Sequence, residues 1–327
     1  DVVVPIFVPP YGIRQEDVAD AIATAARTEL TKPILAVLMG REGLPAGRAE
    51  LLKFGIPTYV FPESVARALA ALNRHVEWAA IPPSSPEPLA VDTVRAIAIF
   101  NKAAKAGREQ LTQFEALDLL EAYGVPTAKV RLVDDPSKLV ATAAALGYPV
   151  AMKIVSPDIV HKTDVGGVAV GLRSETDVRT AYDAMMKRVA ERAPKAKVTG
   201  VLLQQMVSGG RELIVGLMRD PGFGPLVMFG IGGVMVEALG DVVFRMAPID
   251  TRQAHDMLRG IRGTKLLDEL RGDAAVDRDA LADVLRRIAQ LGHDFPQLLE
   301  LDANPVLASD KGVLALDARV KVRVSAI

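Results

Sequence analysis

Residues that could carry chemistry lie mainly in the second half of the sequence, and Lys153 is the first of them. It stands within the apolar stretch 150–155, where every neighbour favours burial. A buried ammonium group without a partner costs free energy, so this lysine needs an anion, either a phosphate or a carboxylate. A lysine on an edge strand that reaches solvent is an equally good interpretation of Lys153 taken alone.

A polar loop at residues 156–168 follows this stretch and contains His161, Lys162 and the pair Gly166-Gly167. Paired glycines allow backbone N–H groups to approach a phosphate closely, although they more often make a turn. His161 is either an ordinary loop histidine or a nucleophile. Neutral imidazole is available at about neutral pH and accepts phosphoryl groups.

Oxygen donors come together near the C-terminus. Two apolar strands, 298–307 and 312–317, flank a turn, and counting outward from it places Asn304 approximately opposite Asp317. Asp302 shares a face with Asn304, so these oxygens could bind a hard cation such as Mg²⁺. The alternative is a pair of polar residues beside a turn, which the apolar character of both strands disfavours. With the lysine and the glycine loop, the set meets the needs of phosphoryl transfer, where positioning and charge neutralisation do most of the work.

The elements that must position these residues are of two kinds. In the first 80 residues, apolar runs alternate with helical segments, a pattern typical of a parallel sheet covered on both faces. We expect an α/β, flavodoxin-like domain at 1–80 and a proline-rich linker at 81–107. From 108 to 327, short turns join the strands, and Thr112 with Glu115 predicts a capped helix start. This second domain is expected to be α+β, with antiparallel pairing.

Composition excludes several classes of protein. Half of the 327 residues are hydrophobic, and 39 basic against 40 acidic residues leave a net charge of −1, a poor fit to a nucleic-acid-binding surface. No apolar run is long enough to span a membrane, and there is no cysteine for disulfides, thiolate metal sites or nucleophilic catalysis. We expect a cytoplasmic protein. Because the sequence begins at Asp1 within an apolar run, we also expect part of a longer polypeptide.

Several motifs in the second domain resemble one enzyme family. They are Tyr123-Gly124-Val125-Pro126, Tyr148-Pro149-Val150-Ala151-Met152-Lys153, His161-Lys162-Thr163-Asp164-Val165-Gly166-Gly167, Gly222-Phe223-Gly224-Pro225, Phe244-Arg245-Met246-Ala247-Pro248, and Asp302-Ala303-Asn304-Pro305 with Asp317-Ala318-Arg319. With these motifs, residues 111–322 resemble the ATP-grasp domain of nucleoside-diphosphate-forming (ADP-forming) acyl-CoA synthetases, relatives of succinyl-CoA synthetase. The first 80 residues resemble the small flavodoxin-like ligase domain of such enzymes.

The resemblance implies an acid-thiol ligase that joins a carboxylic acid to CoA with ATP, through an acyl phosphate and a phosphohistidine. His161 would receive the phosphoryl group. In the nucleotide site, for ATP or ADP, Lys153 would hold phosphates and Glu212 would contact the ribose. Gln204-Gln205-Met206 would form a hinge beside adenine. The other nucleotide-binding residues would be Lys162, Gly166 and Gly167. Asn304 and Asp317 would bind Mg²⁺, with Asp302 in support. Succinyl-CoA synthetases have a glutamate in place of Gln204, so the choice between adenine and guanine stays open.

The family's CoA-binding domain, and the domain with its main phosphohistidine, have no counterpart in the sequence. The resemblance therefore implies that CoA binds through other domains or a partner subunit, that the chain alone is an incomplete ligase, and that the complete enzyme is an oligomer. One alternative is a non-catalytic, ligand-sensing module of a GNAT-type protein lysine acetyltransferase, although such a sensor could lose His161 without penalty. Another is an ATP-grasp carboxylate–amine ligase, which needs no histidine relay.

Overall fold

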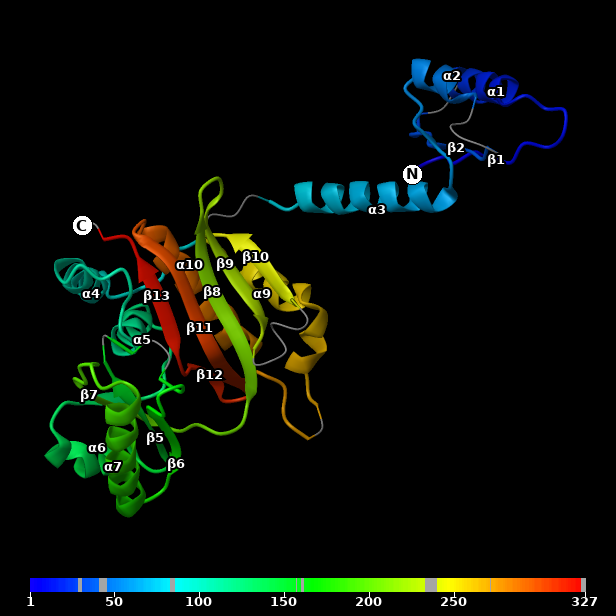
Figure 1. The fold of residues 1–327 in the computed structure, drawn as a ribbon. Helices are drawn as coiled ribbons and strands as arrows, with labels where there is room; N and C mark the ends of the chain where they lie inside the picture. Colours follow the sequence, from blue (N-terminus) through cyan, green and yellow to red (C-terminus); the bar gives the residue numbers. More distant parts are fainter. Residues whose placement is uncertain are drawn as a thin grey trace. The chain divides into compact units, whose positions relative to one another are not determined.

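The computed structural model of the chain describes residues 1–28, 31–40, 46–82, 86–156, 158–159, 162–232, 240–270 and 272–324. The chain divides into two compact units, residues 1–84 and 85–327 (Figure 1). Each unit has its own sheets and its own hydrophobic cores.

The first unit is built on a three-stranded parallel sheet in the order β1-β2-β3. Its elements are β1 (Ile6–Phe7), α1 (Gln15–Thr28), β2 (Ala36–Leu38), α2 (Arg48–Lys53), β3 (Thr58–Tyr59) and α3 (Pro62–Ala79). Because successive side chains of a strand point to opposite faces, Ala36 and Leu38 join one core with Leu51, while Val37 joins another with Val65. The parallel sheet covered on both faces, which the apolar runs predict, is confirmed.

The second unit contains two antiparallel sheets, each the base of one lobe. The small lobe has four strands in the order β4-β7-β5-β6, and the large lobe has β10-β9-β8-β11-β12, with β13 also paired to β11. The strands are β4 (Val130–Val133), β5 (Val150–Val155), β6 (Val168–Leu172), β7 (Gly200–Gln205), β8 (Arg211–Asp220), β9 (Gly224–Ile231), β10 (Val242–Met246), β11 (Leu298–Ser309), β12 (Gly312–Ala315) and β13 (Ala318–Val322). Every strand pair described in this unit is antiparallel, which confirms the α+β expectation.

Helices cover one face of the large sheet. Helices α9 (Thr251–Gly260) and α10 (Arg278–Asp294) pack on β8, β9 and β10 (Figure 1). Helix α10 buries Leu281, Leu285 and Ile288 in a core shared with Val215 and Phe229 of the sheet. Leu301 and Ala303 of β11 belong to this core, so Asp302 between them points to the opposite face of the sheet. That face carries the candidate site described below.

Two helices complete the small lobe. They are α6 (Leu139–Leu146), which follows the 3₁₀ turn Pro136–Lys138, and α7 (Glu175–Arg192). Helix α7 buries Val178, Met185 and Val189 against the small sheet. Sequence analysis assigned no element to α7, although these residues recur at helical spacing after the N-cap Ser174.

The predicted linker at 81–107 was wrong over much of its length. Residues in this range form helix α4 (Thr93–Lys105), which packs on α5 (Gln113–Ala122). Ala96, Ile99 and Phe100 of α4 are buried, and Phe100 lies 4.8 Å from Phe295, ring centroid to ring centroid. The basic residues of this stretch lie on the exposed side of a helix whose other side belongs to the core. The capping box at the start of α5 is present as predicted.

The two lobes meet at Ala315, the last residue of β12, and along the segment between β12 and β13. Ala128 donates its N–H to Ala315 O (2.9 Å), and Ala315 donates to Pro126 O (2.9 Å). The same segment pairs with β11, because Leu316 N–H donates to Pro305 O (2.9 Å). This segment therefore ties the region that leads into β4 to the large sheet.

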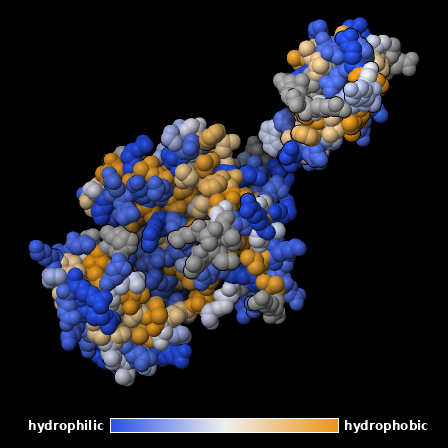
Figure 2. All heavy atoms as spheres, turned by 45° about the vertical axis from the view of Figure 1, so that its right-hand side comes forward, coloured by the Kyte–Doolittle hydropathy of each residue, from blue (hydrophilic) through white to orange (hydrophobic). Residues whose placement is uncertain are grey.

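The surface carries apolar side chains in both units. Figure 2 shows apolar and hydrophilic residues intermixed over the visible face of each unit. Trp78 and Phe223 are exposed by 68% and 70% of their surface. Within the described ranges, no helix combines the length and the apolar character that crossing a membrane requires.

Candidate functional site

The site is organised around Lys153, the only charged residue of β5. Its neighbours Met152 and Ile154 are fully buried, while the Lys153 side chain keeps 18% of its surface exposed. Its Nζ lies 3.5 Å from Oδ2 of Asp317, in the segment between β12 and β13. The anionic partner that a lysine in an apolar strand requires is therefore a carboxylate from the other lobe.

Two more cations surround this ion pair. Lys162 is partly buried, and burial lowers the pKa of its ammonium; repulsion by Lys153 and Arg319 lowers it further, while Asp317 opposes the shift. Arg319 lies on β13 directly opposite Asp302 of β11 and is exposed. We call Lys153, Lys162, Arg319, Asp302 and Asp317 the charge cluster. Three cations held near two carboxylates leave positive charge available for an anion such as a phosphate.

The oxygen donors lie where the sequence placed them. Asn304 donates its N–H to Asp317 O (3.2 Å), which confirms that the two residues are opposite each other. Asp317 Oδ1 accepts from the N–H of Ala318 (2.8 Å), which orients that carboxylate. The Asn304 side chain is exposed.

Asp302 is the most constrained of these groups. Burial raises the pKa of its carboxyl; Arg319 opposes this shift and Asp317 adds to it. Its Oδ1 is buried, and no described residue forms a hydrogen bond with it. A buried oxygen without a partner, next to a second carboxylate and an amide, fits a divalent cation. No group of three or more His, Cys, Asp or Glu placed to hold a metal occurs in the ranges that the structure covers, so a cation would also need Asn304, water or phosphate oxygens.

The glycine pair forms a turn, the more common of the two uses that its spacing allows. Gly166 donates its N–H to Thr163 O (3.0 Å), and Gly167 donates to Lys162 O (2.7 Å), so both amides are engaged inside the loop. Gly166 has a φ of +69°, and a Cβ on Gly167 would lie 2.5 Å from Cγ2 of Ile154. The pair closes a turn against β5, which is the more common role of such glycines. His161 lies outside the described residues.

The segment Gln204-Gln205-Met206 ends β7 and leads toward the large sheet. Gln204 is buried, and its Nε2 donates to Leu316 O (2.6 Å) across the two lobes. The N–H of Gln205 donates to Lys129 O (3.0 Å), and that of Met206 to Pro149 O (2.9 Å). A ligand beside this segment would therefore meet side chains and carbonyl oxygens rather than these two amides.

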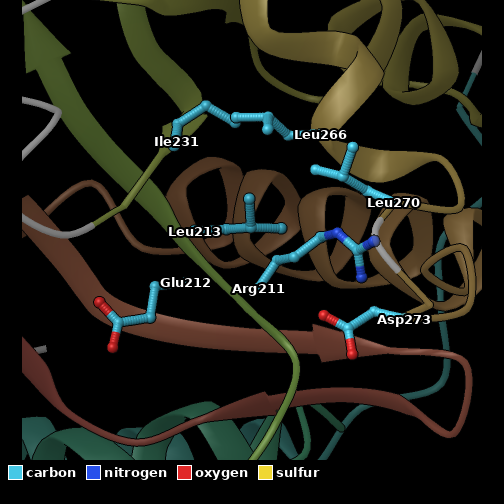
Figure 3. A pocket seen from close by; sticks show the side chains of 7 residues that line it. All are labelled: Arg211, Glu212, Leu213, Ile231, Leu266, Leu270 and Asp273. Atoms are coloured by element: carbon cyan, nitrogen blue, oxygen red, sulfur yellow. The ribbon is translucent and has the colours of Figure 1, made fainter.

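Glu212 lies near the start of β8, on the rim of a cavity of about 240 Å³. In Figure 3, Leu213 points toward Leu266 and Ile231, while the carboxylate of Glu212 points away from them. The structure thus places Glu212 apart from this apolar group. Its exposed carboxylate makes no hydrogen bond within the described part of the chain and can accept from a hydroxyl group.

Sequence analysis missed Arg319 as a site residue. The motif Asp317-Ala318-Arg319 supports the family resemblance, but only Asp317 is predicted from it as a site residue, a ligand of Mg²⁺. A signal was available, since Arg319 alternates with the apolar Val320 and Ala318 on a strand beside Asp302.

Two lobes, each built on an antiparallel sheet, place cations and oxygen donors where they meet, an arrangement suited to binding a nucleotide and a divalent cation. A family model described as ATP-grasp domain matches residues 102–322, so this region is an ATP-grasp domain.

Relatives specify the family further. The chain is 37% identical to a 4-hydroxybutyrate–CoA ligase (ADP-forming) of Nitrosopumilus maritimus, over 97% of this chain and 46% of that protein. It is 40% identical to the beta subunit of acetate–CoA ligase (ADP-forming) I of Pyrococcus furiosus, over 66% of this chain and 94% of the subunit.

A solved structure that is similar to this chain comes from the same family of enzymes. It is that of a Candidatus Korarchaeum cryptofilum acetyl-coenzyme A synthetase 1, with a TM-score of 0.67 and 42% identity, covering 70% of this chain and all of that one. The chain belongs to the family of ADP-forming acyl-CoA ligases. It spans less than half the length of the N. maritimus relative.

Proposed function

We propose that the chain is the nucleotide-binding, phosphoryl-transfer part of an ADP-forming acyl-CoA synthetase. The complete enzyme would convert a carboxylic acid, CoA and ATP to acyl-CoA, ADP and phosphate. The observation that carries the proposal is the charge cluster, where Lys153 and Asp317 meet from two lobes at 3.5 Å. Phosphoryl transfer needs cations for phosphate oxygens beside oxygen donors for a divalent cation. The relatives described above are all named as ligases or synthetases, which gives the sensing-module alternative no support.

Lys153, Lys162 and Arg319 would bind the phosphates of ATP. Lys162 and Lys153 are held close enough to repel each other, so an added polyanion would relieve an existing repulsion. Gly166 and Gly167 would contribute through the shape of the loop, because their amides already have partners.

Asn304 and Asp317 would hold Mg²⁺, with Asp302 in support. The buried Oδ1 of Asp302, which has no hydrogen-bond partner among the described residues, is the observation that favours this assignment. Bound Mg²⁺ would neutralise charge on the phosphates and polarise them toward attack. Asp317 would then exchange the Lys153 ammonium for the metal, which frees Lys153 for a phosphate oxygen.

The base and ribose would lie toward the strand β7 and the start of β8. The Gln204-Gln205-Met206 segment would lie beside adenine, and the exposed carboxylate of Glu212 would accept from a ribose hydroxyl. Because Gln204 Nε2 is engaged with Leu316 O, its amide oxygen is the atom left to accept a hydrogen bond.

His161 immediately precedes Lys162 and would receive the phosphoryl group. A ring nitrogen of neutral His161 would attack the γ-phosphorus, the bond from that phosphorus to the β–γ bridging oxygen would break, and ADP would leave. One structure of the K. cryptofilum synthetase is described as containing Mg-AMPPCP, with a phosphohistidine segment pointing towards the nucleotide-binding site. That description supports a histidine relay in this family.

The remaining parts of the reaction would use polypeptide beyond this ATP-grasp region. Other K. cryptofilum structures are described as complexes with coenzyme A, and the P. furiosus relative is a separate beta subunit. We therefore propose that CoA binds to another domain or a partner subunit, within an oligomer, and that residues 1–80 are the flavodoxin-like ligase domain. A cytoplasmic location fits the use of ATP and CoA.

Phosphorylation of the chain tests the proposal. Incubation with γ-labelled ATP and Mg²⁺ should place acid-labile label on the protein, and a peptide map should locate it at His161. His161→Ala should lose the label and still bind the nucleotide. Label that persists unchanged in His161→Ala would remove the relay role, and absence of ATP binding by the parent chain would contradict the proposed function as a whole.

A further inference from the structure

The loop that carries Lys162 accepts hydrogen bonds from residues that do not belong to the charge cluster. Two arginines, one turn apart near the end of helix α7, donate to carbonyl oxygens of the loop. Arg188 donates through Nε and Nη2 to Gly166 O (3.4 and 3.3 Å), and Arg192 donates through Nη1 to Asp164 O (3.1 Å). Residues four apart lie on the same face of a helix, so the two guanidinium groups contact the loop together.

Contacts connect these bonds to Lys162 itself. Arg188 lies so close to Gly166 that a Cβ there would be 2.7 Å from Arg188 Nε. The next residue, Gly167, donates to Lys162 O (2.7 Å) and accepts from Ile154 N–H (2.8 Å). The backbone of Lys162 is therefore held between helix α7 and strand β5, the strand that also carries Lys153.

We propose that Arg188 and Arg192 are positioning residues that hold Lys162 beside Lys153, Asp317 and Arg319. Within the described ranges, neither arginine forms a hydrogen bond or ion pair with a member of the charge cluster. A held backbone matters at this position because Lys153 and Arg319 repel the Lys162 ammonium, while Asp317 attracts it. The expected effect on nucleotide affinity rests on the proposed function. The positioning of Lys162 by the two arginines is independent of that function.

The test compares the parent chain with Arg188→Ala/Arg192→Ala. The matched control is Arg179→Ala, since Arg179 is on the same helix but pairs only with Glu175, four residues before it, among the described residues. Arg188→Lys/Arg192→Lys is the conservative variant, because each lysine can still donate to a carbonyl. Folding is checked by circular dichroism and thermal unfolding.

Two measurements are made on each chain. The first is the rate at which acetic anhydride modifies Lys162, by peptide mass spectrometry, relative to the exposed Lys187. The second is the Kd for MgATP by calorimetry. In the double alanine variant we expect severalfold faster modification of Lys162 and about tenfold weaker MgATP binding, because a displaced ammonium loses most of its charge-assisted contact with phosphate. Arg179→Ala should match the parent, and the double lysine variant should recover part of both effects.

Unchanged Lys162 modification in a folded double alanine variant would overturn the positioning role. If that variant does not fold, Arg192→Ala alone decides the question. The exposed Arg192 makes one hydrogen bond among the described residues, and its removal should still speed modification of Lys162. If the parent chain fails to bind MgATP while the modification rates change as expected, the proposed function fails and the positioning role stands.

Discussion

Lys153 Nζ and Asp317 Oδ2 form an ion pair 3.5 Å long that joins the two lobes of the ATP-grasp domain. Lys153 belongs to the small sheet, and Asp317 to the segment that links two strands of the large sheet. The pair satisfies a cation in an apolar strand, and it places a candidate phosphate ligand against a candidate metal ligand. Any change in the angle between the lobes would alter this distance.

Replacing Lys153 by methionine should weaken MgATP binding by about 10- to 100-fold, or about 1.4–2.8 kcal/mol, because a charge-assisted contact to phosphate is lost. Lys153→Arg keeps the charge and should retain much of the affinity. Calorimetry with both variants measures the difference. Equal affinity of Lys153→Met and the parent chain would assign Lys153 to the ion pair alone.

Asp317→Asn should raise the Mg²⁺ concentration required for nucleotide binding by about tenfold, because one charged oxygen donor of the proposed metal site is removed. The exposed Asp310, in the turn between β11 and β12, provides the control Asp310→Asn. Both are compared in Mg²⁺ titrations at fixed ATP. If the two variants behave alike, Asp317 does not hold the metal.

Gly167→Ala should destabilise the chain by about 1–3 kcal/mol, because the new Cβ would overlap Cγ2 of Ile154 in the small lobe. Gly222→Ala meets its nearest atom at 3.4 Å, an ordinary contact, and should change stability by less than about 0.5 kcal/mol. Urea unfolding of the whole chain, followed by circular dichroism, measures both, with Gly222 in the turn between β8 and β9 of the large lobe. A Gly167→Ala chain as stable as the parent would mean that β5 shifts to accept the methyl group.

Because of Glu115, the free energy of unfolding of the chain should decrease as the pH is lowered below about 4.5. Burial alone would raise the pKa of this carboxyl, but hydrogen bonds from Arg108, the Thr112 amide and Lys102 outweigh burial and lower the pKa from 4.5 to about 2. A carboxyl whose pKa is depressed by folding stabilises the fold above its unfolded pKa, and the contribution disappears as pH falls through the folded value. The shift corresponds to about 3 kcal/mol, lost between about pH 4.5 and 2.

Glu115→Gln should therefore lower stability at neutral pH and flatten this acid limb. The exposed Glu109→Gln controls for the change in net charge. Thermal unfolding across the acid range measures both variants. An acid limb in Glu115→Gln as steep as that of the parent would assign the acid sensitivity to other carboxyls.

Local features of this protein could be predicted from the sequence alone. Apolar runs without alternation predicted a parallel sheet because burial on both faces is visible in each strand, whichever strand it pairs with. The capping box predicted the start of α5 because it joins residues three apart. The register of the C-terminal hairpin, with Asn304 opposite Asp317, could be counted from its turn for the same reason.

Contacts between groups that are distant in the sequence depend on the packing of the folded chain. Lys153 reaches Asp317, and Arg188 reaches the loop of Lys162, through packing of elements that no local pattern relates. The predicted linker was wrong for the same reason: helix α4 follows a proline-rich stretch, and its apolar side finds partners only in α5 and beyond. For the glycine pair, the turn and the phosphate loop could not be told apart by spacing, because the choice depends on which groups accept from its amides. Side-chain periodicity reports burial along one element, whereas the charge cluster depends on how two lobes are held together.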